Sequence, residues 1–285
     1  MIKIIRYFLE ALFVYFFFIL SKLFGLKISR ILFSFIFKKI GPFIKSNKVI
    51  DDNLSKFNKN LSIKTKKKIK DNMWSNYGMT FIEYIFLKKF REKNFHIDID
   101  GENILEEVFN KKKPVIFISG HFANFELMSM EITKKKINLA TIYRPLNNFF
   151  LNPFMEYLRK RYICKNQIKK GRAGVKEAIK FINKGYSIAL MLDQRVSEGE
   201  KIKFFNTKAL TTTLPAQLAF KHHLNIVPIF IERSRNDFFK MKIYKPISPF
   251  NFDNKIQLSE KLNEIIENMI IKNPNQWIWT HNRWK

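Results

Sequence analysis

The sequence has few acidic residues. Only 24 of its 285 residues are Asp or Glu, against 52 Lys or Arg, and the formal net charge is +28. A protein this basic is suited to anionic partners: nucleic acid, an anionic membrane surface or an acidic protein. An AT-rich genome would also enrich Lys, Ile, Asn and Phe, so the charge alone does not choose among these partners.

Cysteine is almost absent as well. Cys164 is the only one, which excludes an intramolecular disulfide, and nothing in the sequence argues for an oxidising compartment. Basic neighbours alone do not make a thiol into a catalytic nucleophile. We therefore expect Cys164 to be a structural thiol.

Several compact functional motifs are missing. The sequence has no glycine-rich phosphate loop, no GxSxG nucleophile turn and no two-histidine zinc-protease helix. His222 and His223 are adjacent and have no cysteine pair near them, and no compact nucleic-acid motif is present. These chemistries therefore have no support in the sequence.

An almost unbroken apolar run lies near the N-terminus, at residues 7–20, with basic residues on both sides. A membrane span needs about 20 residues, which this run reaches only by including Glu10 or extending to Leu26. No small-residue cleavage site follows it, as a signal peptide would require. We predict a membrane anchor helix within residues 1–25, near residues 5 to 24; a buried helix is the alternative.

The rest of the chain divides into two parts. Residues 26–92 are predicted to be helical and partly interfacial, because an aromatic stretch with interleaved lysines, "ILFSFIFKKIGPFIK", suits an anionic lipid surface. In residues 93–285, short apolar strands alternate with helical segments. This alternation predicts an α/β catalytic domain with a mixed central sheet flanked by helices on both faces, and "FKMKIYKPI" as an edge strand.

Polar residues follow three predicted strands, where reactive groups collect in open α/β sheets: His121 with Glu126, Tyr143 with Arg144, and Asp193 with Arg195. Two residues five apart lie about 140° apart on one helix and cannot share a face. His121 should therefore lie on the turn after a strand, with Glu126 in the first turn of the next helix.

A histidine held by a carboxylate is suited to general-base catalysis on a hydroxyl. We therefore predict His121 as the base and Glu126 as the carboxylate that orients its ring. The alternative is a surface histidine beside a glutamate that stabilises the helix N-terminus.

Substrate positioning is predicted for Arg144, Asp193, Arg159 and Arg172. Arg144 follows a strand and could pair with a phosphate in bidentate fashion, which lysine would not reproduce. A structural salt bridge between Arg144 and Asp193 is the alternative.

Several segments together resemble the late acyltransferases of lipid A biosynthesis, the lauroyl and myristoyl transferase family, over nearly the whole chain. They are "SGHFANFELM", "YRPLNN", "GRAGVKEAIKFINKGYSIALMLDQ", "TTTLPAQLA" and "PNQWIWTHNRWK". The first contains the family's His-x4-acid signature, at His121 and Glu126. The family often has a small or acidic residue where this chain has Arg195, which leaves the acceptor open.

The resemblance implies an acyltransferase-type sandwich in the cell inner membrane, with the catalytic domain on the cytoplasmic side. It implies transfer of a fatty acyl chain from acyl carrier protein to a hydroxyl of a lipid A precursor. No metal and no diffusible cofactor is expected beyond the phosphopantetheine that carries the donor chain.

Two alternatives stay open at this point. One is an acyltransferase that acts on another glycolipid or an aminolipid. The other is a non-enzymatic, membrane-attached module that binds anionic polymers through its lysines, in which case salt-sensitive binding would survive the loss of His121.

Overall fold

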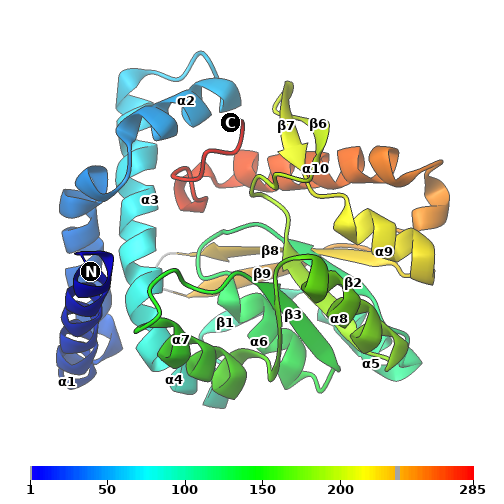
Figure 1. Cartoon of the computed structure of the whole chain (residues 1–285), viewed down its shortest axis with the longest axis horizontal. Coiled ribbons are helices and arrows are strands. Elements are labelled where there is room, and N and C mark those ends of the chain that lie inside the picture. Colours follow the sequence, from blue (N-terminus) through cyan, green and yellow to red (C-terminus); the bar gives the residue numbers. More distant parts are fainter. Residues whose placement is uncertain (1, 235–237) are drawn as a thin grey trace.

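The computed structural model describes residues 2–234 and 238–285. Its first element, α1 (Ile2–Ile44), is not one straight helix, because Gly25 has φ 75 and ψ 171 and bends it. A positive φ is accessible to glycine at little cost, so a hairpin of two helical arms forms at this position. Both arms lie beside the long helix α3 (Ile63–Glu83), at one side of the molecule (Figure 1). The first arm ends at this bend, close to the end of the predicted anchor segment, and the second arm runs on to Ile44.

The central sheet has seven strands in the order β1-β9-β8-β2-β5-β3-β4. The strands are β1 (Ile97–Asp100), β2 (Ile116–Ser119), β3 (Leu139–Tyr143), β4 (Asn166–Lys169), β5 (Ser187–Met191), β8 (Ile226–Arg233) and β9 (Phe239–Ile243). Among the described strands of this sheet, only β8 and β9 pair in antiparallel fashion. The predicted mixed sheet flanked by helices is confirmed.

Helices cover both faces of the middle of this sheet. Successive residues of β2 point to opposite sides, so Ile116 and Ile118 pack into one core cluster and Phe117 into another. The first cluster includes side chains from α8 (Arg172–Asn183), α9 (Leu214–His222) and α10 (Lys255–Lys272); the second includes side chains from α4 (Leu87–Glu92), α5 (Glu102–Lys111), α6 (Glu126–Lys134) and α7 (Asn152–Leu158). Burial on both faces explains why β2 is a continuous apolar run.

The prediction that residues 239–247 form an edge strand is wrong. β9 lies between β8 and β1, and β1 pairs with it in parallel as the outer strand. β9 alternates buried and exposed residues, so one of its faces is covered by the core and the other is not. That alternation resembles the pattern of an edge strand, although both backbone edges are paired.

The remaining elements connect these layers. They are α2 (Asn47–Phe57), the short 3-10 helices η1 (Tyr84–Phe86), η4 (Pro249–Asn251) and η5 (Pro274–Gln276), the π-helix η2 (Arg159–Ile163) and an antiparallel hairpin of β6 (Glu200–Phe204) and β7 (Thr207–Thr211). The C-terminal segment returns to α2, where Asn53 donates hydrogen bonds to the carbonyls of Trp279 and His281. These hydrogen bonds hold the C-terminal segment against α2.

Candidate functional site

A histidine and an aspartate form the centre of the site. His121 Nδ1 lies 2.7 Å from Asp193 Oδ1, and the His121 backbone N–H donates to Asp193 Oδ2 at 2.8 Å. Because a carboxylate only accepts, Nδ1 carries the proton, and Nε2 is left as the basic nitrogen. The Asp193 side chain is buried, whereas the His121 side chain is 18% exposed. A fixed tautomer with an accessible Nε2 suits a general base.

The sheet register brings the two residues together. β2 and β5 are adjacent parallel strands in which Ser119 is paired with Met191. His121 and Asp193 each lie two residues beyond this pair, at the carboxyl ends of their strands. Trp277 Nε1 donates to Asp193 Oδ2 at 2.7 Å, so both oxygens of the carboxylate are used.

Glu126 does not hold the His121 ring, which corrects the predicted contact. It is the first residue of α6, as expected, but Tyr84 Oη donates to its Oε1 at 2.5 Å and Arg159 Nη2 lies 2.7 Å from the same oxygen. Asp193 already occupies the Nδ1 side of the imidazole, and Glu126 instead neutralises a cation of the π-helix η2. The two carboxylates therefore belong to separate groups.

The turn between His121 and α6 has an unusual conformation. Ala123 has φ 44, which is uncommon for a residue with a β-carbon. Its N–H donates to the carbonyl of Gln276, and its carbonyl accepts from Asn76 Nδ2 and Thr80 Oγ1. Surrounding structure thus fixes this turn, as expected where strain is kept at a functional site.

A buried ion network supports the same turn. Glu83 is fully buried and pairs with Arg30 and Arg233, and Asn124 Nδ2 donates to its second oxygen at 2.8 Å. Burial would raise the pKa of Glu83, but the charges of the two arginines and their hydrogen bonds outweigh it and lower that pKa. The network thereby fixes the side chain of Asn124, which follows His121 by three residues in the same turn.

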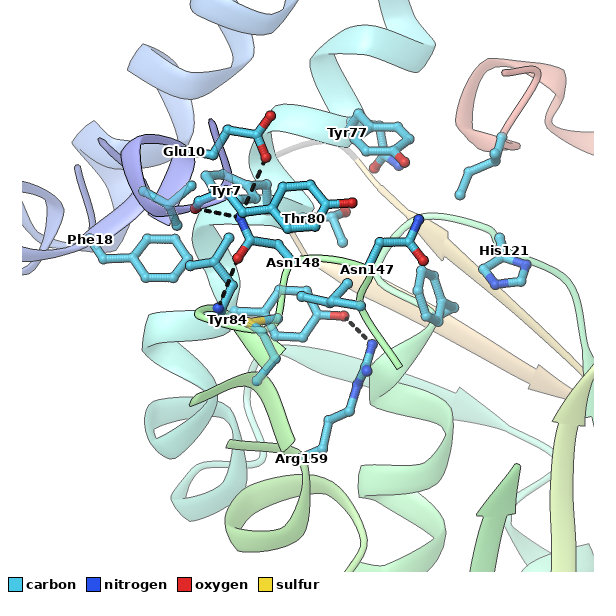
Figure 2. Close-up of a pocket in the computed structure, with 18 of the residues that line it drawn as sticks. Tyr7, Glu10, Phe18, Tyr77, Thr80, Tyr84, His121, Asn147, Asn148 and Arg159 are labelled. Atoms are coloured by element: carbon cyan, nitrogen blue, oxygen red, sulfur yellow. Dashed lines mark hydrogen bonds between the residues drawn. The ribbon is translucent and has the colours of Figure 1, made fainter. Parts of the chain in front are cut away.

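His121 opens into a cleft of about 570 Å³. Its walls come from the first arm of α1, from α3, from residues 146–155 and from Arg159. Figure 2 shows His121 and Phe18 on opposite sides of the lining residues, with Tyr84 and Arg159 between them. On the α1 side, the ion-paired Arg6 and Glu10 line one part of the cleft, and Val14 and Phe18 line an apolar part. A chain-like apolar substrate could extend from the histidine toward that apolar part.

The four predicted positioning residues lie in different surroundings. Arg159 lines the cleft. Asp193 does not reach it as a substrate ligand, which corrects that prediction, because His121 and Trp277 take both of its oxygens. Arg144 and Arg172 are exposed and are not among the cleft residues.

Arg144 makes no salt bridge to Asp193. Its charge acts instead on Lys170, whose pKa is lowered first by burial and then by this neighbouring cation. Two cations that repel one another at the end of β3 and β4 would both gain from an anionic ligand.

Asp193 is ionised in this setting. Burial would raise its pKa, but the charge of His121 and the hydrogen bonds from His121 and Trp277 outweigh that effect and lower it. His281 lies nearby with its Nε2 accepting from the Arg195 N–H at 2.9 Å, and burial lowers the pKa of His281 to about 4. His281 is therefore neutral near pH 7, and His121 remains the imidazole that pairs with Asp193.

His281 should make the protein less stable in acid. Its pKa is lower in the folded chain than in the unfolded chain, so the unfolded state binds more protons between about pH 6.5 and pH 4 and stability falls as pH decreases through that range. In acid, His281 should lower the free energy of unfolding by an amount on the order of 2 kcal/mol. Replacing it with Gln, whose amide oxygen can accept the same hydrogen bond, should remove this loss.

Urea unfolding of both proteins from pH 4 to pH 7.5 measures this difference. The two free energies of unfolding should converge near pH 7 and separate below pH 6. Parallel pH profiles would show that His281 is not held neutral by the fold.

Sequence reasoning missed three residues of the site: Tyr84, Trp277 and His281. No local pattern marks them, because each reaches the site from a distant segment. Trp277 and His281 do lie in "PNQWIWTHNRWK", a segment matched to the family on its residues alone.

Comparison with known proteins gives the same family as the sequence motifs. The model of the family described as bacterial lipid A biosynthesis acyltransferase matches residues 1–285. Lipid A biosynthesis acyltransferase 2 of Shigella flexneri is 22% identical over 197 residues, 67% of this chain and 61% of that protein. Lipid A biosynthesis lauroyltransferase of Escherichia coli (strain K12) is 23% identical over 193 residues, 66% of this chain and 61% of that protein.

The alignments thus span about three fifths of each relative's length. Among solved structures, the 1-acyl-sn-glycerophosphate acyltransferase of Thermotoga maritima has a TM-score of 0.43 at 16% identity, covering 89% of this chain and 100% of that one. The family model covers every residue of the sequence. The chain therefore belongs to the bacterial lipid A biosynthesis acyltransferase family.

Proposed function

We propose that this protein transfers a fatty acyl chain from acyl carrier protein to a hydroxyl of a lipid A precursor. The observation that carries the proposal is the His121–Asp193 pair, whose basic nitrogen is accessible at one end of a largely apolar cleft. A base beside an apolar cleft is what acyl transfer to a hydroxyl requires.

In this mechanism His121 Nε2 takes the proton of the acceptor hydroxyl as that oxygen attacks the thioester carbonyl. Asp193 holds the ring and stabilises the imidazolium that forms. The tetrahedral intermediate then collapses, the C–S bond breaks, and the imidazolium returns its proton to the leaving thiolate. The products are an ester and the free thiol of the carrier.

Arg159 supplies positive charge to the same cleft. Glu126 and Tyr84 fix its Nε and Nη2, while its buried Nη1 has no hydrogen-bond partner among the described residues. That group is suited to the developing oxyanion or to a phosphate of the substrate. Glu126 then acts as a positioning residue for Arg159.

The surface charges suit the proposed partners. Acyl carrier protein is acidic, and the protein carries an excess of basic residues. Arg144 and Lys170 at the strand ends, with Arg172 at the start of α8, are suited to the phosphate of an anionic acceptor. The acyl chain would arrive on the phosphopantetheine of the carrier.

The outer face of α1 is proposed to hold the protein on the cytoplasmic side of the inner membrane. This helix is long and apolar enough to cross a membrane, yet only 17% of its most apolar 18-residue window is buried. Its inner face packs on α3 and on Phe154, through Phe33, Phe18 and Tyr15. A hairpin packed on one side and apolar on the other suits attachment in the plane of one leaflet.

Charges placed on this face should release the protein. Ile19 and Leu23 are 65% and 77% exposed, and changing both to Glu should lower partition onto anionic vesicles at least tenfold, because each buried aliphatic side chain contributes about 1.5–3 kcal/mol. Vesicle co-sedimentation measures the change. The matched control changes Phe250 of η4 and Ile271 of α10, exposed apolar residues outside α1, to Glu and should sediment as the parent does. Equal sedimentation of both variants would place the attachment elsewhere.

An acyl-transfer assay tests the function. The full-length protein in detergent is mixed with acyl-acyl carrier protein and, in parallel, a lipid A precursor, another glycolipid and an aminolipid. We expect a new ester on the lipid A precursor by mass spectrometry. Ester formation only on another acceptor would reassign the substrate, and inertness toward every acyl thioester would refute the proposal.

A further inference from the structure

A second pocket, of about 470 Å³, lies at the bend of α1. Leu26 and Lys27 line it from α1, Lys89 from α4, and Phe95 and His96 from the segment that leads into β1. It shares no residue with the cleft that contains His121. It is therefore a separate site that the proposed acyl transfer does not use.

The described lining of this pocket is cationic and contains no carboxylate. Lys27, Lys89 and Lys93 line it and form no ion pair with any described residue. Arg30 lies on its inner wall, where Glu83 holds the guanidinium by a hydrogen bond of 2.7 Å from Nε. Three such lysines around one pocket repel one another, and a bound anion would relieve that repulsion.

His96 provides the second, independent indication of a ligand. Its side chain is buried, Nε2 lies 3.1 Å from Glu131 Oε1, and its buried Nδ1 has no hydrogen-bond partner among the described residues. A buried polar atom without a partner is costly, which favours a ligand that supplies one. Because Nε2 faces the carboxylate of Glu131, Nδ1 is the ring nitrogen left to hydrogen-bond a ligand.

Apolar side chains extend from the same pocket. Leu26 belongs to the bend of α1, next to the exposed Phe24 and Ile28, and Phe95 is 62% exposed. The pocket thus combines exposed lysines with apolar side chains that continue onto the face proposed to contact the membrane. A soluble anion would use only the first of these features.

We propose that this pocket binds the phosphate group of an anionic membrane lipid. Lys27, Lys89 and Lys93 surround the phosphate, His96 Nδ1 forms a hydrogen bond with it, and the acyl chains lie along Leu26 and Phe95. Binding at the bend would connect the α1 hairpin to α4 and to the start of β1.

Titration calorimetry on the full-length protein in neutral detergent tests the site. The probes are dihexanoyl phosphatidic acid, dihexanoylglycerol and inorganic phosphate. Only phosphatidic acid should bind well. Changing Lys89 and Lys93 to Gln should weaken its binding about tenfold or more, since charge-assisted hydrogen bonds are lost.

Two further variants separate the site from general charge effects. The control residues Lys64 and Lys68 are exposed and, like Lys89 and Lys93, are four residues apart. They lie at the end of α3 away from α4 (Figure 1), so changing both to Gln should leave the affinity for phosphatidic acid unaltered. His96→Gln keeps a nitrogen near the Nε2 position for Glu131 but has none at Nδ1, and it should weaken binding while its circular dichroism spectrum stays that of the folded protein.

Equal weakening in the Lys64 and Lys68 variant, or parent-like affinity in the Lys89 and Lys93 variant, would overturn the site. Inorganic phosphate that binds as tightly as phosphatidic acid would overturn the lipid assignment. Acyl transfer should be retained in every variant, because none of these residues lines the His121 cleft, so failure here is distinguishable from failure of the proposed function.

Discussion

Replacing Asp193 with Asn is expected to lower kcat by about 10² to 10⁴ with little change in KM. The substitution preserves shape but removes the charge that fixes the Nδ1–H tautomer of His121 and stabilises its imidazolium. Because the carboxylate is buried and faces His121 and Trp277, it makes no direct contact with substrate. Steady-state acyl transfer measures the effect, and near-UV circular dichroism verifies the packing around Trp277.

A double-mutant cycle tests whether His121 and Asp193 act together. His121 and Asp193 act as one unit, so His121→Ala combined with Asp193→Asn should cost little more than the worse single change. His121→Ala combined with Glu126→Ala should instead multiply the two losses, because Glu126 acts on Arg159. Multiplicative losses for His121 and Asp193, or near-normal turnover of Asp193→Asn, would refute the proposed roles.

The local part of the site was predictable from sequence. A strand that ends in Ser-Gly, followed by a histidine and then a helix that starts at Glu126, depends on neighbouring residues alone. The partner of His121 was not predictable, because it depends on β5 lying next to β2, and strand order is a long-range property. Had the order been known, the equal offsets of His121 and Asp193 from their strand ends would have identified the pair.

The same distinction holds for the fold. Strands buried on both faces, such as β2, were evident as short apolar runs, and these predicted the helix-covered mixed sheet. β4 and the β6–β7 hairpin were not predicted, since their segments carry polar residues at most positions and show no apolar run. The position of β9 inside the sheet also depends on long-range pairing with β1.

The second large effect concerns Arg159. Replacing it with Ala is expected to lower kcat/KM by about 10² to 10³, the usual cost of removing a group that stabilises developing negative charge. Arg159→Lys should restore little of this, because a single ammonium cannot contact Glu126 and Tyr84 through separate nitrogens and still present a free one to substrate. Steady-state kinetics with the lipid acceptor measures both variants.

Stability separates this role from a structural one. Glu126→Ala alone leaves a mostly buried guanidinium without its carboxylate and should cost about 3–5 kcal/mol of unfolding free energy, whereas removing both partners should cost less than that single change. Glu264→Gln breaks the surface pair with Lys261 and serves as the control, with an effect below about 1 kcal/mol. If Glu126→Ala/Arg159→Ala recovers stability but not turnover, Arg159 acts on the substrate. Recovery of both would make the pair purely structural and leave His121 and Asp193 as the only catalytic unit of the cleft.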